Sequence, residues 1–223
     1  MASSASPTER YVQVSGGDVP LDADLYVPAS AKAVVAFAHG SGSNRYSPRN
    51  RYVAGVLQQA GLATLLFSLL TPEEEAHDLI TGRLRFDIDL LGRRMVGVTD
   101  WLASDQSTRS LRVGYFGSST GAAAALIAAA ERPDAVGAVV SRGGRPDLAG
   151  PALARVRAPT LLIVGGDDTT VIALNRQAMA SLKPETELAI VPGATHLFEE
   201  PGALEKAAEL ARDWFVRHLL PGG

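Results

Sequence analysis

Residues 117–121 read Gly-Ser-Ser-Thr-Gly, a pattern with the residue types of a nucleophile on a sharp turn. An apolar run at 111–116 precedes it, and residues 122–130, all Ala, Leu or Ile, follow it as a strong helix former. A serine at such a strand-to-helix corner stands above the sheet, while the two flanking glycines let the strand and the helix approach each other. Ser119 is therefore the candidate nucleophile.

A serine hydroxyl needs a positioned base, usually a histidine, and a carboxylate that orients this base. Later segments supply both, because Asp167 and Asp168 follow the apolar run 160–164 and His196 follows the run 187–191. The order serine, aspartate, histidine is the order in which a sheet of this type delivers a catalytic triad. On this ground alone either aspartate fits, and Asp168 has the alternative role of capping the next helix.

Alternating strands and helices must position these residues. The alternation predicts an α/β fold, a three-layer α/β/α sandwich around a mostly parallel, eight-stranded sheet, with reactive groups at the carboxyl ends of its strands. The first two strands are expected to form an antiparallel hairpin. Strands are expected at 11–15, 19–27, 33–38, 62–67, 111–116, 135–140, 160–164 and 187–191, and helices at 48–59, 84–103, 120–131, 170–181 and 202–219.

Composition narrows the remaining classes of protein. The 223 residues carry a formal net charge of −3, are 46% hydrophobic and include no cysteine. Thiolate chemistry and disulfides are thereby excluded, and neither a nucleic-acid surface nor a membrane span is expected. We expect a flexible tail at 1–9, one domain at 10–223 and a cytoplasmic protein without cofactor or metal, and leave a homodimer open.

Four motifs make the sequence resemble the α/β-hydrolase fold and, within it, the dienelactone-hydrolase-like family. The family's acid loop places the acid on Asp168. Dienelactone hydrolases proper use a cysteine nucleophile, and this chain has no cysteine. The resemblance therefore implies a serine hydrolase of similar architecture. The motifs are His39-Gly40-Ser41-Gly42, the pentapeptide at 117–121, Gly165-Gly166-Asp167-Asp168 with Val171, and Gly193-Ala194-Thr195-His196 with Phe198.

The triad pattern and the resemblance together predict a serine hydrolase that cleaves carboxylic esters or lactones of small substrates through an acyl-enzyme. Ser119 attacks the carbonyl, His196 transfers the proton and Asp168 holds the imidazole. The backbone N–H groups of Ser41 and Thr120 are expected to form the oxyanion hole. The alternative is a protein that keeps this fold to bind or sense a small ligand without turnover.

The substrate pocket is expected to be shallow and open, because residues 141–159 leave room for one short helix and not for a cap domain. Leu69, Leu70 and Phe198 flank strand ends or the candidate catalytic histidine, so they are candidates for apolar pocket walls. His39 ends an apolar strand, and we expect it to brace the loop that follows.

Two arginines follow the run 135–140, near the expected mouth of the site. Arg142 and Arg145 have the planar guanidinium that binds a carboxylate through two hydrogen bonds, so Arg142 is a candidate for holding a charged substrate group. The alternative, which we favour, is that both arginines pair with Asp147 or with the glutamates at 73–75.

Overall fold

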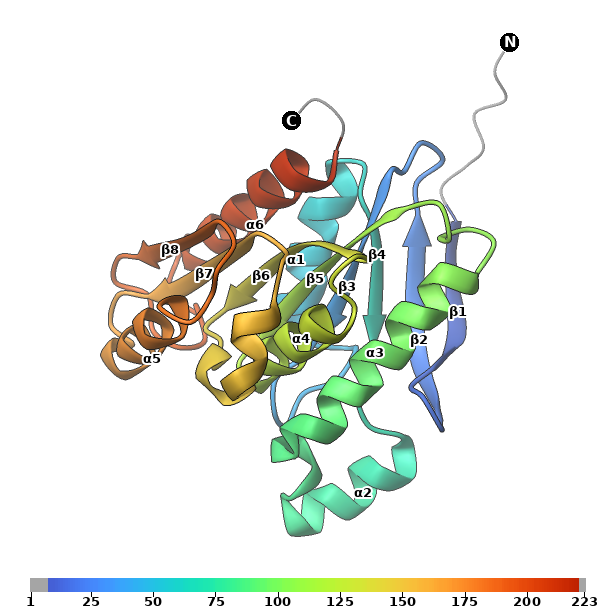
Figure 1. The fold of residues 1–223 in the computed structure, drawn as a ribbon, viewed down its shortest axis with the longest axis horizontal. Coiled ribbons are helices and arrows are strands. Elements are labelled where there is room, and N and C mark those ends of the chain that lie inside the picture. The colour runs from blue at the N-terminus through green and yellow to red at the C-terminus, as the bar shows by residue number, and fades with distance from the viewer. Residues whose placement is uncertain (1–7, 221–223) are drawn as a thin grey trace.

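The chain forms one eight-stranded sheet with helices on both faces (Figure 1). The computed structural model describes residues 8–220. The strands lie in the order β1-β2-β4-β3-β5-β6-β7-β8; β2 is antiparallel to both its neighbours, and all other pairs are parallel. The predicted architecture is confirmed. The strands are β1 (Thr8–Ser15), β2 (Pro20–Val27), β3 (Ala33–Ala38), β4 (Ala63–Phe67), β5 (Arg112–Ser118), β6 (Val136–Arg142), β7 (Thr160–Gly165) and β8 (Thr186–Val191).

The predicted N-terminal hairpin is present at the edge of the sheet. β1 and β2 pair from Thr8 opposite Val27 to Ser15 opposite Pro20. The strand therefore starts two residues before the domain boundary expected at residue 10. Residues 1–7 of the expected tail lie outside the described residues.

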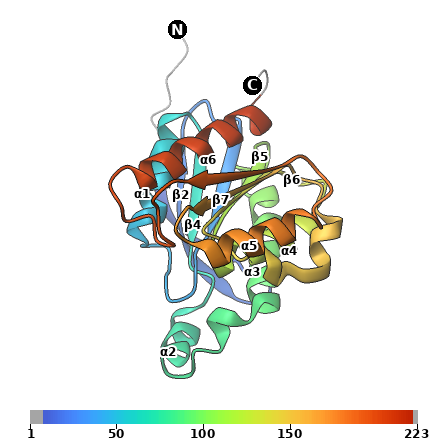
Figure 2. The ribbon, with the colours of Figure 1, turned by 90° about the vertical axis from the view of Figure 1, so that its left-hand side faces the viewer.

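Helices α1 (Pro48–Gln59) and α6 (Ala203–Leu219) cover one face of the sheet, and α3 (Ile88–Ser104), α4 (Thr120–Glu131) and α5 (Thr169–Met179) cover the other (Figure 2). Side chains of a strand alternate between the two faces. Both faces are covered, so the central strands need apolar residues at every position. This explains why their sequences read as continuous apolar runs rather than alternating ones.

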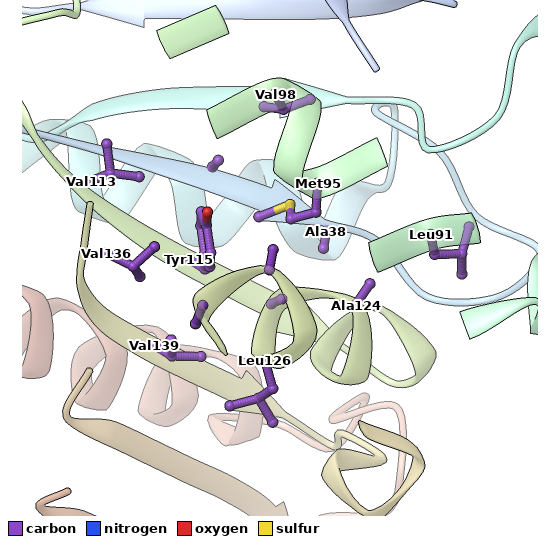
Figure 3. Packing of buried hydrophobic residues seen from close by; sticks show 14 of the residues in the cluster. Ala38, Leu91, Met95, Val98, Val113, Tyr115, Ala124, Leu126, Val136 and Val139 are labelled. Atoms are coloured by element: carbon purple, nitrogen blue, oxygen red, sulfur yellow. The ribbon is translucent and has the colours of Figure 1, made fainter. Parts of the chain in front are cut away.

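The packing of α3 and α4 fixes the corner that carries Ser119. Figure 3 shows Met95 and Val98 of α3 above Tyr115 of β5, with Ala124 of α4 alongside, and all four side chains are fully buried. The first turns of α4 are almost all alanine, which lets this helix lie close to the sheet and to α3. Helix α4, which begins directly after Ser119, therefore packs against both the sheet and α3.

The helix expected at 84–103 begins later than predicted. Leu84–Phe86 forms a separate 3-10 turn, η1, and α3 begins at Ile88 with Asp87 as its N-cap. The buried carboxylate of Asp78 accepts the N–H of Leu84 at 2.6 Å. Asp78 thus caps the start of η1, and the chain turns at Asp87 before α3 starts.

Helix α2 (Pro72–Thr81), which was not predicted, projects from the body of the protein below α3 in Figure 1. Its start carries a complete capping box, in which the side chains of Thr71 and Glu74 each accept the other's backbone N–H. Asp78 is the only buried residue of the helix. With almost nothing buried, α2 lacks an apolar stripe that faces the core. Its sequence signals are at its ends: the capping box, Pro72 and the glutamates at 73–75 mark its start, and Gly82 marks its end.

The segment between β6 and β7 holds one short 3-10 element, η2 (Pro146–Arg155), and no cap domain, as predicted. No helix among residues 8–220 is long and apolar enough to cross a bilayer.

The order of the strands reverses between β3 and β5, since the chain continues from β3 to β4 on one side and from β5 to β6 on the other. Open α/β sheets bind ligands beside such a reversal, outside the carboxyl ends of the strands. The residues expected to do chemistry follow β3, β5, β7 and β8 at this edge.

Candidate active site

Ser119 sits at a strained corner between β5 and α4. Its φ of 50° and ψ of −123° lie outside the regions that a non-glycine residue usually occupies. A Cβ on Gly117 would lie 2.5 Å from the Cα of Ala122, and one on Gly121 would lie 2.3 Å from the carbonyl oxygen of Ala38. Both glycines are thus required by close approach of the backbone, and the serine is held half-exposed above the sheet.

The loop after β3 lies against this corner. His39, 7% exposed, braces the loop as expected: its Nδ1 is 2.9 Å from the carbonyl oxygen of Gly40, and its Nε2 accepts the N–H of Leu69 at 2.9 Å. Burial lowers the pKa of His39, against the opposing effect of the Gly40 carbonyl. The backbone N–H groups of Ser41 and Thr120 find no acceptor among residues 8–220.

Asp168 and His196 meet across the ends of β7 and β8. Asp168 Oδ2 lies 2.6 Å from His196 Nδ1. Asp168 occupies the N-cap position of α5, but its side chain makes no capping bond there. The neighbouring Asp167 is exposed. Of the two aspartates that the sequence left open, Asp168 is the one that contacts the imidazole.

Two further contacts hold the histidine loop. Glu200 accepts both the backbone N–H of Thr195 at 3.0 Å and its hydroxyl at 2.5 Å, and these hydrogen bonds lower the pKa of the Glu200 carboxyl. Asp167 donates its backbone N–H to the carbonyl of Ala194 at 3.0 Å, which ties the acid loop to the histidine loop. These contacts fix the positions of the loops that carry His196 and Asp168.

Ser119 and His196 line the same open cavity. The cavity has a volume of about 220 Å³ and is open to solvent. The expected pocket wall Phe198 does not line it: this side chain is 1% exposed and packs in the core beneath, whereas Leu197, 43% exposed, lines the cavity. The other lining residues are Gly40, Ser41, Ser43, Ser47, Arg49, Ser118, Arg142 and Gly143.

The two arginines after β6 differ in their partners. Arg145 binds both carboxylate oxygens of Asp147, at 2.9 and 2.8 Å, so the pairing interpretation is correct for this residue. It is wrong for Arg142, which forms no ion pair with any carboxylate among residues 8–220. Arg142 is 7% exposed and lines the cavity that contains Ser119.

A second, smaller cavity, of about 50 Å³, borders the loop after β3. Leu69 and Leu70 line it, as expected of pocket walls, and Leu79 and Leu91 add further apolar surface. The lining also includes the polar or charged residues Asn44, Ser68, Glu75, Asp78, Arg85 and Thr120. The two cavities share Gly40, Ser41 and Ser43. The loop after β3 thus borders both the cavity with the leucine wall and the cavity lined by Ser119 and His196.

Leu197, Ser43, Ser47 and Arg49 were not predicted to line the site. Their only sequence signal is proximity to His196 and to the loop after β3. No group of three or more His, Asp or Glu side chains suited to holding a metal ion occurs between residues 8 and 220.

The strand order, the strained serine and the carboxylate-backed histidine are those of an α/β-hydrolase. A model of the dienelactone hydrolase family matches residues 21–219, and the chain belongs to that family. This membership supports hydrolase activity.

Both solved structures and curated sequences include proteins that are similar to this chain. A dienelactone hydrolase from Anabaena variabilis ATCC 29413 is 62% identical, with a TM-score of 0.94 over 96% of this chain and 100% of that one. A dienelactone-hydrolase-like promiscuous phosphotriesterase from metagenomic libraries shares the fold at 17% identity, with a TM-score of 0.78 over 96% of this chain and all of its own. Two Mycobacterium tuberculosis proteins, from strains CDC 1551 and H37Rv, are 59% identical over 96% of this chain. Both carry the name "Putative phosphoribosyl transferase", and the chain spans 48% of their length.

Proposed function

We propose that the protein is a serine hydrolase that cleaves carboxylic esters or lactones of small substrates through an acyl-enzyme on Ser119. One observation carries the proposal: a strained serine and a carboxylate-backed imidazole line one open cavity at the carboxyl edge of the sheet. A family of hydrolases matches nearly the whole chain, which supports the same class of reaction.

The chemistry requires one proton carrier. The oxygen of Ser119 forms a bond to the acyl carbon while its proton moves to His196 Nε2, and this proton passes to the departing alcohol oxygen as the ester bond breaks. Water then repeats the exchange and releases the acid. With Asp168 at Nδ1, the imidazole is held with Nε2 free to accept, and the imidazolium formed in each step is stabilised.

The oxyanion of each tetrahedral intermediate needs donors that are already in place. The N–H groups of Ser41 and Thr120 fit this role, because neither is used within the described residues and both backbone segments flank Ser119. The N-terminus of α4 adds its positive end at the same point. His39 contributes by holding the loop that carries Ser41.

The two cavities divide a substrate into two parts. The departing alcohol must lie where His196 can protonate its oxygen, so it occupies the cavity lined by His196 and Arg142. The acyl group then extends across the oxyanion loop into the cavity lined by Leu69 and Leu70. We infer that the acyl group is small and apolar.

The test combines a fluorophosphonate probe with short-chain p-nitrophenyl esters. We expect stoichiometric labelling, mapped by mass spectrometry to Ser119 and not to the adjacent Ser118, and we expect Ser119→Ala to abolish both labelling and turnover. Turnover that survives Ser119→Ala would overturn the mechanism. A protein that neither reacts with the probe nor cleaves any ester, but binds small esters tightly, would be the non-catalytic sensor instead.

The transferase name of the two Mycobacterium tuberculosis proteins supports no second candidate. It belongs to proteins about twice as long as the matched region. The loop after β3 has no lysine and does not follow the phosphate-loop pattern of a glycine pair enclosing four residues before Lys-Ser/Thr.

A further inference from the structure

Arg142 is a buried cation without a counter-charge. The residue is buried, its Nη1 has no hydrogen-bond acceptor in the described part of the chain, and no carboxylate there pairs with it. Burial, together with the nearby positive charge of Arg49, lowers the pKa of Arg142 to about 10, so the guanidinium remains charged at neutral pH. An unpaired buried charge destabilises a fold, and its presence calls for a partner that the folded chain does not supply.

The guanidinium is also held firmly in place. Its carbon lies 5.9 Å from the ring centroids of both Phe116 and Phe198, close enough for an attraction between the cation and each aromatic face. The Arg142 carbonyl accepts the N–H of Ser119 at 3.4 Å, and three residues later Arg145 donates its N–H to the Ser119 carbonyl at 3.0 Å. The arginine loop and the nucleophile turn therefore form one hydrogen-bonded unit.

The rest of this cavity is suited to a negative group. Arg49 lines it, and its one carboxylate partner, Glu199, is 63% exposed and lies 3.0 Å away. Ser47, which also lines the cavity, caps helix α1, and the first turn of this helix has no acidic residue. The positive end of α1 thus faces the same space as the two guanidinium groups.

We propose that Arg142, assisted by Arg49, binds an oxyanion carried by the departing alcohol of the substrate, a carboxylate or a phosphate. This inference rests on the proposed ester hydrolysis, which places the alcohol beside His196. The enzyme then selects esters of small apolar acids with charged alcohols. The planar guanidinium donates two parallel hydrogen bonds to such a group, and the ligand supplies the counter-charge that the chain lacks.

Matched ester pairs test the selection. The first pair is para-acetoxybenzoate and its methyl ester, and the second is para-acetoxyphenyl phosphate and its dimethyl ester, so each pair differs only in the charge on the alcohol. We expect wild type to prefer the charged member, and Arg142→Met to lower the ratio of the two kcat/KM values roughly 10- to 100-fold. Comparing this ratio between variants cancels the intrinsic reactivity of each ester, and the pair that changes more identifies carboxylate or phosphate.

Arg145→Gln is the matched control, because it removes the same charge three residues away from a side chain already paired with Asp147. We expect this variant to keep the wild-type ratio. An equal fall in both variants, or no fall in Arg142→Met, overturns the proposal. Should Arg142→Met fail to fold, Arg142→Lys retains the charge without the planar fork, and an intermediate ratio is expected.

Binding of the anion is measured separately from hydrolysis. Benzoate and phenyl phosphate are added to wild type, Ser119→Ala and Arg142→Met, and the melting temperature is recorded. We expect a rise with at least one anion in the first two proteins and no rise in Arg142→Met. If no ester is cleaved but this pattern holds, the hydrolytic function fails and the anion site stands. If the neutral esters are cleaved and the melting temperatures respond equally in all three proteins, the anion site fails alone.

Discussion

Two histidines, His39 and His196, lie at the carboxyl edge of the same sheet, and their surroundings give them different tasks. His39 follows β3, is 7% exposed, and has both ring nitrogens engaged with backbone groups. His196 follows β8, has a 40% exposed side chain, and uses one nitrogen to contact Asp168. The difference lies in access, since only His196 has a ring nitrogen left to exchange a proton with a substrate.

The comparison teaches that residue type and strand end are not enough to assign a base. A buried imidazole that bridges two backbone groups is a fixed, neutral connector. A half-exposed imidazole backed by a carboxylate is a proton carrier. Substitutions of the two histidines and of their partners should therefore differ in their effects on kcat and on stability.

The largest effect is expected from His196→Ala. Removing the proton carrier should lower kcat by roughly four to six orders of magnitude while the melting temperature stays close to wild type, because the side chain is not part of the core. The measurement is steady-state hydrolysis of p-nitrophenyl acetate together with a thermal melt. A larger loss of kcat in His39→Ala than in His196→Ala would reverse the assignment of the two histidines.

The next effect concerns the acid. Asp168→Asn removes the charge that holds the imidazole tautomer, and we expect kcat to fall about three to four orders of magnitude. The control is Asp167→Asn, an adjacent exposed position whose side chain does not contact the ring. We expect it to keep kcat near the wild-type value. A more damaging Asp167→Asn would move the acid to that position.

Much of this site followed from the order of residues along the chain. Apolar runs with strand-end motifs indicated the sheet, the turn at Ser119 and the loops of Asp168 and His196, since these depend on local sequence and on the general rules of parallel sheets. What remained hidden depends on contacts between distant segments. That Arg142 has no carboxylate partner among residues 8–220 is decided by which side chains the fold brings near it, and the burial of Phe198 by the core beneath it.

A smaller loss of activity is expected from His39→Ala. Without the imidazole, the buried N–H of Leu69 loses its acceptor and the loop carrying Ser41 loses its brace. We expect kcat to fall roughly 10- to 100-fold, less than the full cost of losing an oxyanion donor, with a stability loss of about 1–3 kcal/mol. His39→Asn, whose amide has both a donor and an acceptor, should recover part of each. Kinetics and urea denaturation measure the two effects, and unchanged kcat in His39→Ala would separate this histidine from the oxyanion loop.

The smallest effect is the dependence of stability on pH. Burial holds the pKa of His39 below the ordinary histidine value of about 6.5, so between the two values the unfolded chain binds a proton that the folded protein does not. The free energy of unfolding therefore rises with pH across this interval: the contribution is complete above about pH 7 and is lost as the pH falls below about 6.5.

His218 changes stability in the same direction, because burial of its side chain, which lies beside Trp214 in the last turns of α6, also lowers its pKa. The contribution of His39 is therefore the difference in slope between wild type and His39→Asn, with His218→Gln as the matched control. Urea midpoints between about pH 5 and 8 give these slopes. His39→Asn should reduce the slope of the free energy of unfolding against pH on the acidic side. His218→Gln should retain the part of the slope that His39 contributes. Equal slopes in wild type and His39→Asn would mean that His39 takes up a proton as readily in the folded protein as in the unfolded chain. Its role as a fixed neutral connector would then be wrong, and the contrast with His196 would reduce to the presence of Asp168.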